Sequence, residues 1–196
     1  MVVWPPSQLE DIRLRKIDAG PIMVFTLLFG LAIFLGWAST KVAFGLILRA
    51  DEGGAGWFVA VFAFSYAYAM IFSRLHLQCF PLKAGAVVEG SKEEFHYHVY
   101  LLFYLSLFQP LTRGYVVPVP IMRLIYLALG ARLSENTYSA GTILDPPLTV
   151  IGDNTIVGHD ALIFSHIVEG SELILAPVQI GSNVTIGAKA VIMPGV

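Results

Sequence analysis

The sequence contains little cysteine and little charge. Cys79 is its one cysteine, so the chain makes no internal disulfide and offers no Cys-rich zinc pattern. Charged residues make up 13% of the 196 residues, against roughly 25% in a typical soluble domain. The net charge of −2 gives no basic field that would suggest a nucleic-acid partner. A hydrophobic content of 56% and a mean hydropathy of +0.72 indicate a membrane protein instead.

Two uncharged apolar runs are each long enough to cross a bilayer. They are PIMVFTLLFGLAIFLGWAST, residues 21–40, and GGAGWFVAVFAFSYAYAMIF, residues 53–72. About twenty apolar residues in a helix span the ~30 Å of hydrocarbon. A cleaved signal peptide is one alternative for the first run, but a charged tail precedes it and a second run follows. Buried core helices are the other alternative, but a chain this short could not enclose two of them in protein. We therefore predict two transmembrane helices.

The basic residues around these runs predict an orientation. Arg13, Arg15 and Lys16 precede the first run, Arg74 and Lys83 follow the second, and the connecting loop carries Lys41 and Arg49. Lys and Arg are enriched on the cytoplasmic side of membrane proteins. We expect a multi-pass membrane protein whose two termini, and everything after the second run, lie in the cytoplasm.

The segment between the runs and the C-terminal third is apolar but broken into short pieces. Residues 95–108 are too few for a span and predict an interfacial helix. A second short helix is predicted at residues 121–129, which Gly130 would end. His96 and His98 point about 200° apart on a helix and cannot share a metal there, although on a strand they would face the same way. Residues 1–130 thus form the predicted membrane anchor.

A six-residue rhythm runs through the C-terminal third. Units that begin at Ile151, Val157, Ile180 and Ile186 have an aliphatic residue, then glycine, then a small or β-branched residue at the fifth place. A period of six fits neither a helix nor an alternating strand, and it predicts a solenoid of triangular coils. The aliphatic residues would point inward, and Gly and Asn near the corners would relieve strained backbone. The alternative is a β-rich domain whose turn signals happen to recur.

Two stretches carry a resemblance to a known family. LGARLSENTYSAGTILDPPLTVIGDNTIVGHDALIFSH and PVQIGSNVTIGAKAVIMPGV resemble the hexapeptide-repeat acyltransferases of bacteria and archaea. The resemblance covers residues 129–196. It implies that residues 131–196 form a left-handed parallel β-helix (a hexapeptide-repeat solenoid) after the two transmembrane helices, and that the protein is a homotrimer using acetyl-CoA. Because no C-terminal cap follows Met193, we expect either that the sequence is a fragment, which we favour, or that a partner surface covers that end.

Acyl transfer needs a base that takes the proton of the attacking group, and histidine titrates in the useful range. The resemblance implies His166 as this base, because the six-residue rhythm breaks just after it. His159 is the rival, and either histidine is alternatively a solvated turn residue. Glu169 is predicted to orient the imidazole. Gly187, Ala188 and Lys189 are predicted to contact the cofactor arm, and no metal is predicted.

The leading hypothesis is therefore an acyltransferase at the membrane. It would move an acetyl group from acetyl-CoA to a hydroxyl or amine of a glycan or lipid-linked acceptor. A non-enzymatic, membrane-tethered scaffold is one alternative. A zinc carbonic anhydrase-like protein is another, which the spacing of His159 and His166 makes less favourable.

Overall fold

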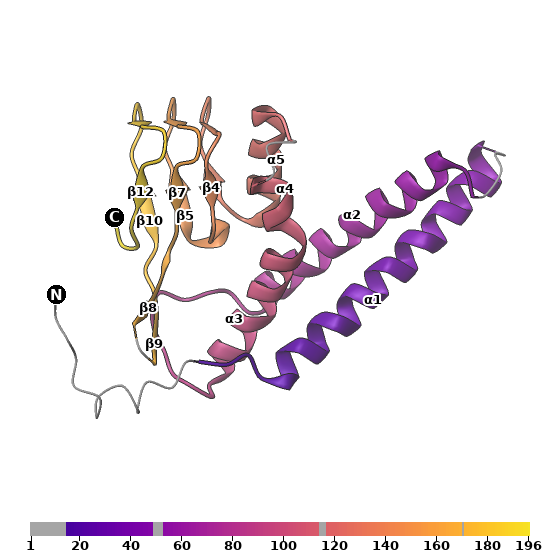
Figure 1. The fold of residues 1–196 in the computed structure, drawn as a ribbon, viewed down its shortest axis with the longest axis horizontal. Helices are drawn as coiled ribbons and strands as arrows, with labels where there is room; N and C mark the ends of the chain where they lie inside the picture. The colour runs from indigo at the N-terminus through magenta and orange to yellow at the C-terminus, as the bar shows by residue number, and fades with distance from the viewer. Residues whose placement is uncertain (1–14, 49–52, 114–116, 170) are drawn as a thin grey trace.

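The computed structural model describes residues 15–48, 53–113, 117–169 and 171–196. Its first long helix, α1 (Ala19–Val42), continues into the π-helical turn η2 (Ala43–Leu48), and α2 (Ala55–Cys79) runs back beside it (Figure 1). The predicted run 21–40 lies within α1, and most of the predicted run 53–72 lies within α2. Arg13 and Arg49, which contributed to the predicted orientation, lie outside the described residues.

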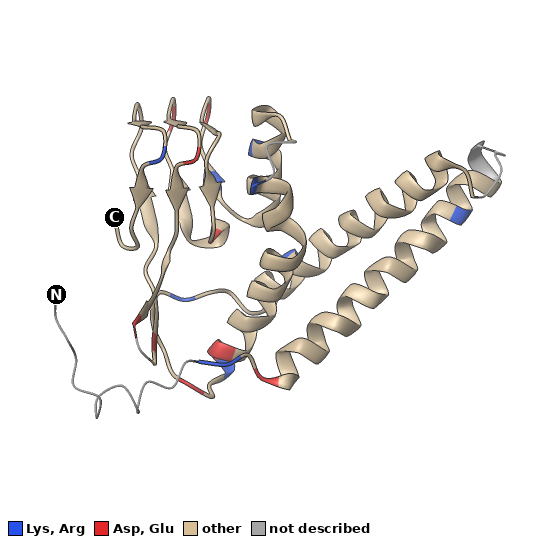
Figure 2. Ribbon diagram, viewed as in Figure 1, with Lys and Arg blue, Asp and Glu red and all other residues tan. Residues whose placement is uncertain are grey.

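Both long helices are apolar and long enough to span a membrane. Figure 2 shows almost no charged residue along their length. They pack closely because Gly36 of α1 faces Ser65 of α2, where an added Cβ atom would come within 2.7 Å of the Ser65 backbone nitrogen. A hydrogen bond of 2.8 Å between the hydroxyls of Ser39 and Tyr68 joins the pair further along. The two helices thus form one hairpin, which projects away from the sheets (Figure 1).

Shorter helices connect this hairpin to the sheets. They are α3 (Lys92–Phe103), the π-helical turn η3 (Tyr104–Phe108), α4 (Gln109–Arg113) and α5 (Val119–Leu129). The Ser91 side chain caps α3 by accepting a hydrogen bond from the Glu94 backbone N–H. Gly130 ends α5 in a left-handed conformation, φ 113°, as predicted. The predicted helices at 95–108 and 121–129 are therefore confirmed as helices.

The strands are two to four residues long. In chain order they are β1 (Gly85–Val87), β2 (Arg132–Leu133), β3 (Tyr138–Ser139), β4 (Thr142–Ile143), β5 (Thr149–Ile151), β6 (Ile156–Val157), β7 (Leu162–Ile163), β8 (His166–Glu169), β9 (Glu172–Leu175), β10 (Val178–Ile180), β11 (Thr185–Ile186) and β12 (Val191–Ile192). A short 3-10 helix, η4 (Pro146–Leu148), lies between β4 and β5. Three sheets are parallel, in the orders β10-β5-β2, β11-β6-β3 and β12-β7-β4, and the fourth, β1-β9-β8, is antiparallel.

The predicted fold class was a left-handed parallel β-helix preceded by two transmembrane helices, and its β-helix part is wrong. The described chain is a mixture of helices and four small, separate three-stranded sheets, one of them antiparallel, and it is not plainly a β-helix. The physical reason is that the six-residue pattern specifies only which short strands lie side by side. It says nothing of the antiparallel sheet, nor of the helices that pack against the strands.

The spacing of the aliphatic residues nevertheless sets the register of the parallel strands. Ile151 lies opposite Ile180, Val157 opposite Ile186, and Ile163 opposite Ile192. Ile151, Val157 and Ile163 are fully buried. A slip of one residue would turn these side chains outward, so their burial fixes the pairing.

Gly and Asn have different roles at the turns between the strands. Asn154 and Asn183 take positive φ angles of 52° and 61°, so asparagine relieves the backbone as predicted. Gly152 and Gly158 do not take positive φ. They are needed because neighbouring turns stack closely: a Cβ atom on Gly158 would lie 2.6 Å from the Ala188 nitrogen. The predicted reason for these two glycines is wrong, and close backbone approach replaces it.

Tyrosine hydroxyls cover the outer edge of β4. Tyr104 donates to the Ile143 carbonyl at 2.6 Å, and Tyr100 donates to the Leu144 carbonyl at 3.2 Å. Tyr126 of α5 accepts from the Ile143 N–H and donates to the Gly141 carbonyl. These bonds satisfy an edge that would otherwise be open, and they hold α3 and η3 against the end of β4.

Candidate functional site

Asp145 lies two residues after the end of β4, where the sequence DPP follows Leu144. Pro146 disfavours helical backbone in the residue before it, and Asp145 has φ −119° and ψ 71°. The Asp145 residue is 1% exposed. Because Leu144 donates its backbone N–H to Ile163, the chain segment after β4 lies beside the segment after β7. One oxygen of the Asp145 carboxylate accepts the Ser165 N–H at 2.9 Å as a result.

His166 opens β8, the first strand of a hairpin that leaves the parallel sheets. Its partner β9 places Leu175 opposite His166 and Glu172 opposite Glu169. β1, which follows α2, adds a third strand on the other side of β9. The break in the six-residue rhythm is therefore an antiparallel sheet that includes a segment some eighty residues earlier in the chain.

The His166 imidazole and the Asp145 carboxylate form a close pair. His166 Nδ1 lies 2.7 Å from Asp145 Oδ2. This hydrogen bond raises the pKa of His166, and burial opposes the rise without cancelling it. With Nδ1 held by the carboxylate, Nε2 has no hydrogen bond to any residue in the described part of the chain. A histidine oriented in this way has one nitrogen left for a substrate.

The pair lies in the wall of a cavity of about 420 Å³ between α3–η3 and the β8–β9 hairpin. We call it the dyad cavity. Its other polar lining residues are Arg15, Tyr97, His98, Tyr104 and Gln109. Its apolar lining residues are Ile17, Leu101, Leu105, Leu144, Val168 and Leu173. Most of the cavity surface is nonetheless apolar, and an apolar cavity with convergent polar groups is typical of a small-molecule site.

Burial and the Asp145 charge raise the pKa of the cavity phenols Tyr97 and Tyr104. Both phenols therefore stay protonated at neutral pH. The His98 imidazole shows the opposite behaviour to His166, because burial lowers its pKa despite the nearby Glu94 and Asp18 carboxylates. Two histidines whose pKa values are pushed apart thus line the same cavity, an arrangement typical of acid–base sites.

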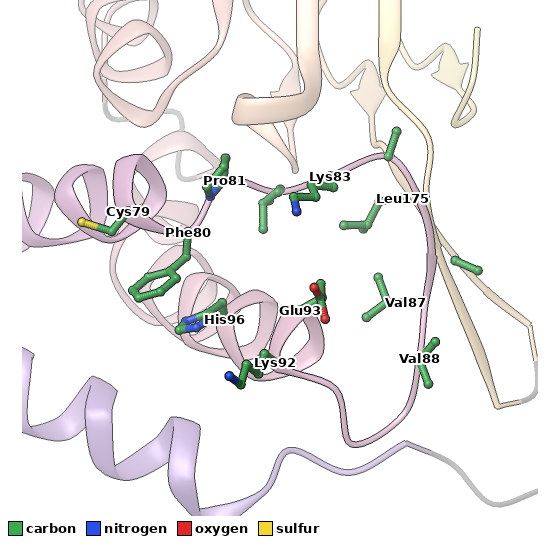
Figure 3. Close-up of a pocket in the computed structure, with 13 residues that line it drawn as sticks. Cys79, Phe80, Pro81, Lys83, Val87, Val88, Lys92, Glu93, His96 and Leu175 are labelled. Carbon is green, nitrogen blue, oxygen red and sulfur yellow. The ribbon is translucent and has the colours of Figure 1, made fainter.

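His96, the other member of the His-x-His pair, lines a different cavity. This second cavity, of about 500 Å³, lies beside the end of α2, and Figure 3 shows Lys83 and Glu93 on its wall. The His96 ring stacks on Phe80 with centroids 3.6 Å apart. Because α3 is a helix, the imidazoles of His96 and His98 line separate cavities. This agrees with the expectation that the two side chains point about 200° apart on a helix.

The other predicted site residues lie away from the dyad cavity. His159 is on an exposed turn beside Asp160, 3.7 Å from its carboxylate, and its backbone oxygen accepts a hydrogen bond from the Lys189 N–H. Gly187, Ala188 and Lys189 form the turn that stacks on this one. Glu169 is exposed at the end of β8. The carboxylate that contacts His166 Nδ1 in the structure belongs to Asp145 and not to Glu169.

A third, more polar cavity lies between these two regions. It has a volume of about 330 Å³ and is lined by Arg113 and Asp160, together with Thr142, Ala161 and Leu162. Gln109 and Leu144 line both this cavity and the dyad cavity. The outer face of β4 and β7 thus runs from the His159 turn, past Arg113, to the Asp145–His166 pair.

No cluster of three or more His, Cys, Asp or Glu side chains suited to a metal ion occurs in the ranges that the structure describes. Comparison with family models, with curated proteins and with solved structures finds no match. The resemblance to hexapeptide-repeat acyltransferases therefore stays a prediction.

Sequence reasoning missed Asp145, the residue that holds His166. The two residues stand 21 positions apart, and no spacing rule links them without knowledge of which strands are neighbours. One signal was present: Asp-Pro-Pro just after an aliphatic pair marks a forced turn carrying a carboxylate.

Proposed function

We propose that this protein is a membrane-bound acyltransferase in which His166 is the general base and Asp145 positions it. The reaction moves an acyl group, expected to be acetyl from acetyl-CoA, to a hydroxyl or amine of a glycan or lipid-linked acceptor. The observation that carries the proposal is the 2.7 Å contact between His166 Nδ1 and Asp145 Oδ2 in the wall of a cavity. Acyl transfer requires an oriented base of this kind beside space for two substrates.

In the proposed reaction, the acceptor oxygen or nitrogen attacks the thioester carbonyl and passes its proton to His166 Nε2. The new bond to the acyl carbon forms while negative charge develops on the carbonyl oxygen. The carbon–sulfur bond then breaks, and the thiol leaves with the proton from His166. Gln109 lies in the same cavity wall and supplies an amide N–H for the developing oxyanion.

We propose that the acyl donor binds along the more polar cavity. Arg113 there offers a cation to a phosphate-bearing donor. The turn Gly187–Lys189, to which the resemblance assigns the cofactor arm, stacks on the His159–Asp160 turn at the far end of the same face. The homotrimer that the resemblance implies is part of this proposal.

The membrane placement supports the choice of acceptor. We propose that α1 and α2 cross the bilayer and that the sheets lie on the cytoplasmic side. Arg15 and Lys16 before α1, and Lys83 after α2, mark that side. The dyad cavity is bounded by Ile17, two residues before α1 begins, so it lies at the bilayer surface in this arrangement.

The test is release of free thiol from acetyl-CoA by the full chain in detergent micelles, against a panel of sugars and lipid-linked sugars. His166→Ala is expected to lower the rate at least about a hundredfold, whereas His159→Ala retains most of it. Circular dichroism would confirm that both variants fold. Full activity in His166→Ala would reject the assignment. Absence of heat on titration with acetyl-CoA, together with no thiol release, would favour the scaffold alternative.

A further inference from the structure

The apolar residues of the dyad cavity gather toward the proposed membrane side. Ile17 belongs to the segment that leads into α1, and Leu101 and Leu105 come from α3 and η3. Val168 and Leu173 face them from the β8–β9 hairpin. Leu105 is 42% exposed and Val168 is 58% exposed. Large apolar side chains exposed in this way, in a cavity that is also lined by Ile17 from the segment leading into α1, form an opening suited to hydrocarbon.

Two of the polar side chains around this apolar part, those of Tyr104 and Arg15, are already engaged within the protein. The Tyr104 hydroxyl donates to the Ile143 carbonyl. The Arg15 guanidinium donates to the Glu94 carboxylate at 3.0 Å and to the Val87 carbonyl at 2.7 Å. The apolar side chains beside them offer no hydrogen bond to a free sugar, and each unpaired hydroxyl that is buried there would cost free energy.

We propose that this apolar part holds the hydrocarbon chain of the acceptor, so that the acceptor is a lipid-linked amphiphile and not a free sugar. The inference rests on the proposed function. The chain enters from the bilayer past Ile17 and lies between Leu105 and Val168, and its polar head reaches His166 and Gln109. The shared residues Gln109 and Leu144 then separate the acceptor chain from the more polar cavity that the donor would occupy.

The first measurement follows binding and needs no turnover. A dodecyl β-glucoside that carries a diazirine at the end of its chain is photolysed with the full protein in phosphatidylcholine nanodiscs. Cross-links are then mapped by mass spectrometry. We expect them on the peptides that hold Leu105 and Val168, and equally in His166→Ala, because the chain site does not need the base. Cross-links spread only over the lipid-facing residues of α1 and α2 would overturn the inference.

The second measurement compares acceptors. Dodecyl β-glucoside is expected to have a KM at least about tenfold below that of methyl β-glucoside. Val168→Ser should raise the KM for the dodecyl probe about fivefold or more, and by a much larger factor than it changes the KM for the methyl probe. Val191→Ser is the matched control, since Val191 is also an exposed strand valine, 55% exposed, and lines none of the three cavities. Equal KM values for the two probes would overturn the inference.

The two measurements separate the two proposals. Cross-linking in the cavity without transfer to any acceptor would leave the chain site standing and reject the acyltransferase. Transfer that depends on His166 but proceeds equally well with methyl β-glucoside would keep the acyltransferase and reject the lipid-linked acceptor.

Discussion

At the scale of single residues, His166 has its pKa raised by the Asp145 hydrogen bond. A base works in its neutral form, so the proposed transfer rate should fall as pH drops through this raised pKa. Replacing the carboxylate by an amide weakens this hydrogen bond, which is the main cause of the raised pKa, and removes the negative charge that adds to it. The pH at which the rate is half-maximal is therefore set by Asp145.

Asp145→Asn should lower kcat about a hundredfold or more and move the midpoint of the pH–rate profile to lower pH. The asparagine amide also leaves the imidazole poorly oriented. The measurement is thiol release between pH 5.5 and 9, with the His166 titration followed by NMR. Glu172→Gln is the control, because Glu172 is an exposed carboxylate on the same hairpin. An unchanged midpoint in Asp145→Asn would contradict the role given to this carboxylate.

At the scale of elements, two glycines of α1 have different surroundings. A Cβ atom on Gly36 would come within 2.7 Å of the Ser65 nitrogen and 2.9 Å of its Cα, whereas a Cβ atom on Gly30 meets nothing within 4 Å. Gly36 thus allows the α1–α2 contact, and Gly30 has no such part in it. Replacing each of the two glycines by alanine therefore separates the effect of helix packing on stability from the effect of helix propensity.

Gly36→Ala should therefore destabilise the hairpin by about 1–3 kcal/mol, because backbone atoms must shift to admit the methyl group. Gly30→Ala should be neutral, or stabilising by up to about 1 kcal/mol, through helix propensity alone. Thermal unfolding of both variants in the same detergent measures the difference. A Gly36→Ala variant as stable as Gly30→Ala would show that the close contact with Ser65 does not form.

At the scale of the whole molecule, the two long helices place one end of the hairpin beside the sheets and the other end away from them (Figure 1). Chemical labelling of the single cysteine, Cys79, tests this arrangement. Cys79 is exposed at the last residue of α2, on the end next to the sheets. If α1 and α2 cross the membrane, Cys79 is reached from the face that carries the dyad cavity.

A membrane-impermeant maleimide should label Cys79 in inside-out vesicles and leave it unlabelled in intact cells. The paired variant carries Cys79→Ser with Gly54→Cys, which moves the thiol to the opposite end of the hairpin. It should show the reverse pattern. Labelling of both positions from one face would contradict a membrane-spanning hairpin and with it the route by which a lipid chain reaches the cavity.

The sequence by itself determined the local features of this protein. The uncharged runs at 21–40 and 53–72 lie in α1 and α2 for the most part, and Gly130 ends α5. The positions of Ile151, Val157 and Ile163 set which parallel strands pair, because burial of an aliphatic side chain at each sixth place fixes the register. Such features follow from patterns within a few residues, and a single sequence contains them.

Tertiary structure decided the architecture and the site. The predicted β-helix class was wrong, because β1 joins β8 and β9 in an antiparallel sheet and α3, η3 and α5 pack on the parallel strands. Asp145 meets His166 only because the segments after β4 and β7 lie side by side. The wall of the dyad cavity that faces this pair comes from α3 and η3, which are distant from both residues in the sequence. Contacts of this kind depend on how separate elements pack in three dimensions, and no spacing within one segment specifies that.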